Sequence, residues 1–152
     1  MMTMVDRFFC DTNVILRAYH NAFPQYVTVK ATFDNLLENG SELWISRQVI
    51  REYLVHLTHP RTFETPFSAE KAIQQVRNVL KICSVADETH MTTRILLTLI
   101  RDYPVSGKQI HDANIVATML ANGIDNVLTL NAADFNRYAD KIRVIVPRSD
   151  NS

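Results

Sequence analysis

Four acidic residues, widely separated in the sequence, stand where they could share one site. Asp11 follows the apolar stretch FFC and precedes an apolar, helix-spaced stretch, so a carboxylate is placed where a buried strand turns into a helix. Glu52 lies in SRQVIREYL after a second strand, Asp112 lies in HDANIVATML, and Asp134 follows the strand VLTL. A buried carboxylate is unfavourable unless a partner compensates its charge. Asp11 is therefore either an ordinary helix N-cap or a ligand of a cation.

Each of the four acids also has an ordinary structural explanation. Asp11 and Asp112 stand near helix N-termini, where a carboxylate accepts backbone N–H groups and complements the helix dipole. Glu52 could be a solvated helix residue and Asp134 a turn residue. For Glu52, the apolar residues on both sides make the surroundings less polar than those of a free helix surface.

If the three or four carboxylates lie close together, they are expected to bind a divalent metal ion. Without cations such a pocket repels itself, and some acids have to take up protons. Magnesium removes this problem, because it favours octahedral oxygen ligands, keeps several waters and binds one or two carboxylates directly. Asp11 and Asp112 are the candidate direct ligands, and Glu52 and Asp134 could complete a second site or hold metal-bound waters. Such a site can activate water and stabilise a leaving alkoxide, so phosphodiester hydrolysis is the natural reaction.

The composition predicts one globular domain and excludes several functions. The chain has 152 residues, 47% of them hydrophobic, which is enough for a core of its own. Its 16 basic and 16 acidic residues give zero net charge, which argues against non-specific coating of nucleic acid or membrane but allows a local basic rim. No spanning apolar run, secretory signal or Gly-rich phosphate loop occurs. Cys10 and Cys83 lie in apolar runs without CxxC spacing and are interpreted as buried free thiols. We therefore expect a single domain over residues 1–152, located in the cytoplasm.

Hydrophobic periodicity and capping residues predict alternating strands and helices. Strands are expected at residues 7–10, 43–46, 81–85, 127–130 and 142–146, and helices at 12–20, 26–39, 47–58, 68–80, 87–101, 111–123 and 132–138. This alternation indicates an α/β fold with a parallel sheet covered on both faces. In such sheets ligands bind beyond the carboxyl ends of the strands, at a topological switch point, and Asp11 falls at such a strand end.

At these residues the sequence resembles the PIN-domain family, particularly the VapC-type toxins of bacterial toxin–antitoxin pairs. The resemblance rests on DTNVIL, SRQVIREYL, HDANIVATML and LTLNAADFNRY, which occur in the family's order over nearly the whole chain. It implies a three-layer α/β/α PIN-like fold with a central parallel sheet and a ribonuclease that depends on Mg²⁺ or Mn²⁺. It also implies a small cognate antitoxin that occupies the groove, and a homodimer. The loop at residues 59–68 follows no family pattern, so the resemblance gives no RNA target.

The resemblance carries seven site residues over to this chain. The catalytic and metal-binding acids are Asp11, Glu52, Asp112 and Asp134, and the supporting polar residues are Asn13, Thr129 and Asn131.

Several other residues near the acids have two interpretations. The basic residues concerned are Arg17, Arg47, Arg51 and Lys108, which either contact phosphates or form ordinary salt bridges. His111 precedes Asp112, but adjacent helix residues point about 100° apart, so His111 is expected to pack or to orient Asp112. Trp44 and Phe135 are expected in the core.

Three functions follow from these observations. The first is a metal-dependent endoribonuclease, the toxin half of a toxin–antitoxin pair. The second is a PIN-like module that binds RNA or protein without cleaving, although such a module has no physical reason to keep a repulsive cluster of acids. The third is a metal-dependent DNA nuclease, which the same carboxylates could serve.

Overall fold

The computed structural model describes residues 4–148, and its centre is a five-stranded sheet in which every strand pair is parallel. The strands are β1 (Arg7–Cys10), β2 (Glu42–Ser46), β3 (Ser84–Ala86), β4 (Asn126–Leu128) and β5 (Arg143–Ile145). Their spatial order is β3-β2-β1-β4-β5. The chain therefore builds outward from β1 to β3, then crosses to the other side of β1. This makes the β1/β4 boundary the switch point of the sheet.

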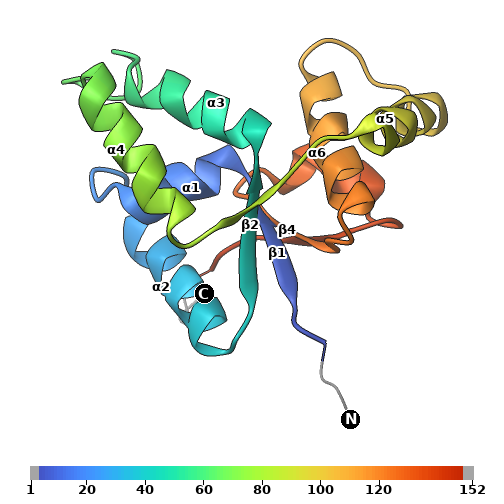
Figure 1. Cartoon of the computed structure of the whole chain (residues 1–152), viewed down its shortest axis with the longest axis horizontal. Coiled ribbons are helices and arrows are strands. Elements are labelled where there is room, and N and C mark those ends of the chain that lie inside the picture. Colours follow the sequence, from blue (N-terminus) through green and yellow to red (C-terminus); the bar gives the residue numbers. More distant parts are fainter. Residues whose placement is uncertain (1–3, 149–152) are drawn as a thin grey trace.

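Helices cover both faces of this sheet (Figure 1). Within residues 4–148 the α-helices are α1 (Thr12–Tyr19), α2 (Tyr26–Glu38), α3 (Arg47–Leu57), α4 (Ala69–Leu80), α5 (His90–Asp102) and α6 (Gln109–Ala121). Helices α1 to α4 lie on one side of the strands, and α5 and α6 pack together on the other. The predicted three-layer α/β/α fold with a central parallel sheet is confirmed. None of the helices in this range is long and apolar enough to cross a bilayer.

The core lies on both faces of the two central strands. Phe9 and Cys10 of β1 and Val127 and Leu128 of β4 are fully buried, as expected for strands of a parallel sheet that helices cover on both sides. Cys10 and Cys83 are free and buried, as predicted. Phe135 is in the core as predicted. Trp44 is only half-buried, because its indole N–H reaches outward to Glu42 at 3.1 Å.

Some predicted boundaries are wrong, and hydrogen bonds explain the differences. Helix α5 begins at His90 instead of Asp87, because Thr89 caps it and the Thr92 hydroxyl accepts from the Thr89 N–H in a capping box. The strand expected at 81–85 begins only at Ser84, since the N–H groups of Ile82 and Cys83 still bond to the end of α4.

Three further boundaries differ around the second half of the sheet. Helix α6 begins at Gln109, two residues before the predicted start. Strand β4 ends at Leu128, although the Thr129 N–H still donates to the Ile145 carbonyl of β5 at 3.0 Å, and the chain bends at Leu130. The helix expected at 132–138 is a pair of short 3-10 turns, η1 (Ala132–Asp134) and η2 (Asn136–Tyr138).

Candidate active site

Asp11 lies where the ends of β1 and β4 adjoin. Its backbone N–H donates to the Leu128 carbonyl at 3.0 Å, across the switch point of the sheet. Its Oδ1 accepts the Thr12 N–H at 2.8 Å and so caps α1, which is one of the two predicted roles. Its Oδ2 accepts from the Thr129 hydroxyl at 2.9 Å and from the Asn13 amide at 3.2 Å. The cap gives Oδ1 a single hydrogen bond, and each carboxylate oxygen has two lone pairs, so the capping role does not exclude the cation-binding role.

Two of the three predicted supporting residues, Asn13 and Thr129, bond to Asp11, and the third, Asn131, bonds to Thr129. The fully buried Thr129 hydroxyl also accepts the Asn131 N–H at 3.0 Å. The Asn13 carbonyl oxygen Oδ1 accepts the Leu130 N–H at 3.1 Å. Asn131 thus joins this hydrogen-bond network through its backbone N–H, whereas Asn13 and Thr129 join it through their side chains. These bonds join the first turn of α1 to the segment after β4.

Thr129→Val is expected to lower the free energy of unfolding by about 1–3 kcal/mol, because valine keeps the shape but removes one of the two hydrogen bonds to Asp11 Oδ2 and the acceptor of the Asn131 N–H. Urea unfolding of the two proteins measures the difference. Thr98→Val is the matched control: Thr98 is exposed and donates only to a carbonyl of its own helix. Equal unfolding free energies for wild type and Thr129→Val would contradict this role.

Glu52 is held by hydrogen bonds from two helices. Its Oε2 accepts from the Thr12 hydroxyl of α1 at 2.5 Å, and its Oε1 accepts from the Gln48 amide of α3 at 2.9 Å. Neither Thr12 nor Gln48 was predicted from the sequence as a site residue. The available signal for Gln48 is its spacing, since a residue four positions before Glu52 lies on the same face of the helix.

Asp112 and Asp134 complete the electrostatic environment. Asp112 is half-buried in the first turn of α6, and Asp134 is exposed in η1. Burial raises the pKa of Asp11 to about 6, hydrogen bonds from Thr129 and Thr12 oppose this, and the charges of Glu52 and Asp134 add to it. Burial also raises the pKa of Asp112 to about 7, with further contributions from the other three acids. The four predicted acids therefore lie within electrostatic reach of one another.

The charge of these acids is poorly compensated by the protein. None of the four forms an ion pair within residues 4–148, although Arg137 lowers the pKa of Asp112 slightly. As the side chains lie, no three His, Cys, Asp or Glu residues of this range converge closely enough to hold a metal ion. The donor chemistry nevertheless fits magnesium or manganese, because all candidate ligands are oxygens and two of the carboxyls gain from a neighbouring positive charge.

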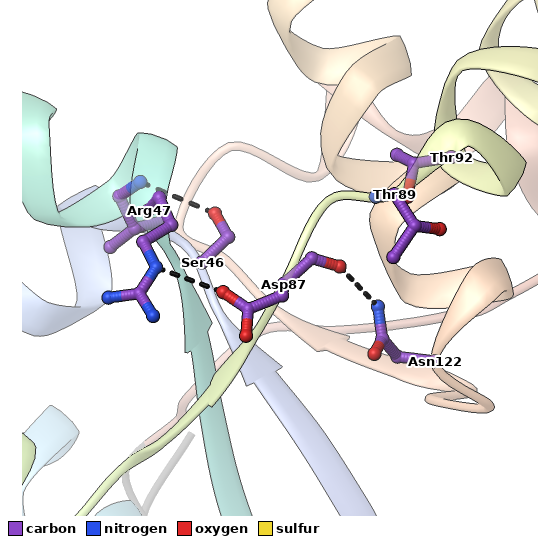
Figure 2. Close-up of polar contacts among 7 residues, drawn as sticks. Ser46, Arg47, Asp87, Thr89, Thr92 and Asn122 are labelled. Atoms are coloured by element: carbon purple, nitrogen blue, oxygen red, sulfur yellow. Dashed lines mark hydrogen bonds and ion pairs between the residues drawn. The ribbon is translucent and has the colours of Figure 1, made fainter.

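Figure 2 shows a polar cluster that fixes the segment between β3 and α5. Arg47 at the start of α3 donates to Asp87 at 2.9 Å, and both side chains are exposed. Of the two roles considered for Arg47, phosphate contact or an ordinary salt bridge, the structure shows the salt bridge. The Asn122 amide at the end of α6 donates to the Asp87 carbonyl at 3.1 Å. The next residue, Glu88, accepts from Asn114 of α6. Glu88 is a further acid close to α6, and it was not predicted from the sequence.

The remaining basic residues and His111 have varied surroundings. The Arg17 guanidinium lies 4.8 Å from the centre of the Phe23 ring. It also donates to the backbone carbonyl of Asn13, in the first turn of α1, at 3.3 Å. Two others, Arg51 and Lys108, are exposed. His111 is exposed, so of its two predicted roles packing is wrong, and the orientation of Asp112 stays a prediction. Its backbone carbonyl instead accepts from Gln48 at 3.3 Å.

Together, the sheet order and the acids beyond the ends of β1 and β4 define a doubly wound α/β protein with an acidic site at its switch point. The family model of the PIN domain matches residues 8–141, and the chain belongs to this family. No curated protein matches the sequence.

Solved structures share the fold at low sequence identity. The chain is similar to VapBC2 from Rickettsia felis bound to a promoter DNA fragment, with a TM-score of 0.67, 15% identity, and 92% of this chain and 98% of that chain covered. It is similar to VapBC-1 from nontypeable Haemophilus influenzae, with a TM-score of 0.66, 16% identity, and 92% and 97% covered. It is also similar to VapC20 of Mycobacterium tuberculosis, described as a Sarcin–Ricin loop cleaving toxin. The TM-score is 0.56 and the identity 18%, and the match covers 79% of this chain and 86% of that chain.

Proposed function

We propose that this protein is a metal-dependent endoribonuclease and the toxin component of a type II toxin–antitoxin system. The observation that carries the proposal is the group of acids at the switch point, in which Asp11 and Asp112 have raised pKa values and no ion-pair partner within the described residues. Membership of the PIN domain family supports it. A structural neighbour described as a Sarcin–Ricin loop cleaving toxin supports the choice of RNA as substrate.

The proposed mechanism assigns a part to each acid. Asp11 and Asp112 would hold Mg²⁺ or Mn²⁺, which supplies a Lewis acid that activates water and neutralises charge on the phosphate. Thr129 and Asn13 orient the Asp11 carboxylate before any ligand arrives. Glu52, whose two oxygens are already held, is suited to orient the attacking water and accept its proton. Asp134 is the most exposed of the four acids and adds a fourth negative charge to the site.

The basic residues and the expected partners follow from the same proposal. Arg17, Arg51 and Lys108 are candidates to contact RNA phosphates, since they lie on the helices that carry the acids or at their ends. We infer a small antitoxin as partner, supported by neighbours that are VapBC and other toxin–antitoxin complexes. A homodimer, a single domain over residues 1–152 and a cytoplasmic location stay predictions.

A cleavage assay with RNA and DNA of the same sequence tests the proposal. We expect RNA cleavage with Mg²⁺ or Mn²⁺ and none in EDTA, because the uncompensated acids need a cation to bind a phosphodiester. Full activity in EDTA would exclude a metal-dependent mechanism. Cleavage of DNA alone would favour the DNA nuclease, and metal binding without turnover on any RNA would favour the non-cleaving module. A small upstream reading frame encoding a DNA-binding protein would support the toxin assignment.

A further inference from the structure

Gln48 is a buried polar residue that connects the two helices carrying Glu52 and Asp112. Only 5% of its surface is exposed. Its Nε2 donates to Glu52 Oε1 at 2.9 Å and to the His111 carbonyl at 3.3 Å. Its Oε1 accepts from the Asn114 amide at 3.1 Å. The side-chain amide of Gln48 therefore has a fixed position, unlike that of a solvated helix residue. Breaking any of its three hydrogen bonds would leave a buried polar group unpaired.

The chemistry of the partners determines which way this amide points. A carboxylate and a backbone carbonyl can only accept hydrogen bonds, so the NH₂ group of Gln48 has to face Glu52 and His111. The Asn114 NH₂ group then needs an acceptor, and the carbonyl oxygen of Gln48 supplies it. Rotating the amide by half a turn would place donors against donors and acceptors against acceptors. The network therefore has one consistent orientation.

The two helices are joined at the turn that carries an active-site acid. His111 and Asn114, the α6 partners of Gln48, stand on either side of Asp112 in the sequence. Gln48 also holds one oxygen of Glu52, while Thr12 of α1 holds the other. The Gln48 side chain thus links the position of Glu52 on α3 to the first turn of α6.

We propose that Gln48 is a positioning residue of this site, which fixes the orientation of the Glu52 carboxylate and its spacing from Asp112. Its consequence for cleavage rests on the proposed ribonuclease function, whereas its consequence for metal binding does not. Through His111 and Asn114, Gln48 also holds the turn of α6 that carries Asp112, a proposed ligand of the metal. Groups that orient the ligands of a metal typically change metal affinity or activity by about 10–100-fold when they are replaced.

Gln48→Met tests this role, because methionine has a similar length and flexibility but no hydrogen-bonding amide. The matched control is Gln74→Met, since Gln74 is exposed on α4 and bonds only to Asn78. Two quantities are measured on the full chain: Mn²⁺ affinity by electron paramagnetic resonance without RNA, and kcat and KM for RNA cleavage. We expect Gln48→Met to weaken Mn²⁺ binding and lower kcat about tenfold or more each, with KM little changed. The control should match wild type in both.

The outcomes separate this inference from the proposed function. If the folded Gln48→Met variant keeps wild-type Mn²⁺ affinity and kcat, or if the wild type binds no Mn²⁺, the positioning role is overturned. If the wild type cleaves no RNA but the variant still loses Mn²⁺ affinity, the ribonuclease proposal fails and the positioning role stands. Should Gln48→Met not fold, Asn114→Ala decides the question, because it removes the donor to Gln48 from the far side. It is expected to weaken Mn²⁺ binding in the same direction, and an unchanged affinity would overturn the role.

Discussion

Asp11→Asn is expected to reduce RNA cleavage by about a thousandfold while the protein remains folded. The reason is that asparagine removes the negative charge proposed to hold the cation, and metal assistance contributes several kcal/mol to the stabilisation of the transition state. Single-turnover cleavage of one RNA with Mg²⁺ in excess measures the effect. Asp112→Asn is expected to have an effect of similar size, because both residues are proposed as direct ligands.

The fold should survive Asp11→Asn for a local reason. Asparagine is as good an N-cap as aspartate, so the bond from the Thr12 N–H to the side chain can be kept. The variant also removes a buried charge whose pKa is raised by burial. Circular dichroism and thermal unfolding check that the fold is intact.

Asp34→Asn is the matched control for this experiment. Asp34 is a half-buried aspartate on α2 that pairs with Lys30 four residues earlier, and it is not among the charges that raise the pKa values of Asp11 and Asp112. Its replacement should leave cleavage near the wild-type rate, since exposed helix pairs contribute little. Full cleavage by Asp11→Asn would show that the reaction does not depend on this carboxylate, and the proposed site would then be wrong.

The secondary structure was largely predictable because local signals determine it. The apolar run of β1 and the serine caps of two helices are examples: Ser46 Oγ accepts the Val49 N–H, and Ser68 Oγ accepts the Lys71 N–H, each at 3.3 Å. The boundaries that differ depend on which of several possible hydrogen bonds form at the end of a helix. Thr89 rather than an earlier residue caps α5, and the segment after Asn131 forms 3-10 turns instead of one helix.

The grouping of the acids was predictable from the rule for parallel sheets, but their partners were not. The strand ends that precede Asp11 and Asp134 meet at one edge, and a sequence pattern shows this. The contact of Gln48 with Asn114 joins residues 66 positions apart, and that of Thr12 with Glu52 joins residues 40 positions apart. Such tertiary contacts depend on how α1, α3 and α6 are placed on the sheet, which no local spacing encodes.

Without metal, the protein is expected to lose stability as the pH rises from about 4 to about 7. In the unfolded chain an aspartate titrates near 3.8, whereas the pKa values of Asp11 and Asp112 in the folded protein are about 6 and about 7. Between these values the folded state binds more protons than the unfolded state, so the free energy of unfolding falls with rising pH. For the buried Asp11 this amounts to about 3 kcal/mol at neutral pH, at about 1.4 kcal/mol per pKa unit.

Magnesium is expected to restore this stability above pH 7 and to have little effect near pH 4, where the carboxyls of Asp11 and Asp112 in the folded protein are protonated and do not attract the cation. At a concentration about a hundred times its Kd, a ligand of the folded state adds about 2.7 kcal/mol. Thermal unfolding across this pH range, in EDTA and in magnesium, measures both effects. The Asp11→Asn, Asp112→Asn double variant should show a flatter pH dependence and a much smaller magnesium shift. A wild-type Tm that is independent of magnesium at pH 7.5–8 would mean that the acids do not bind the cation in the folded state, because linkage requires a ligand of the native protein to raise its stability.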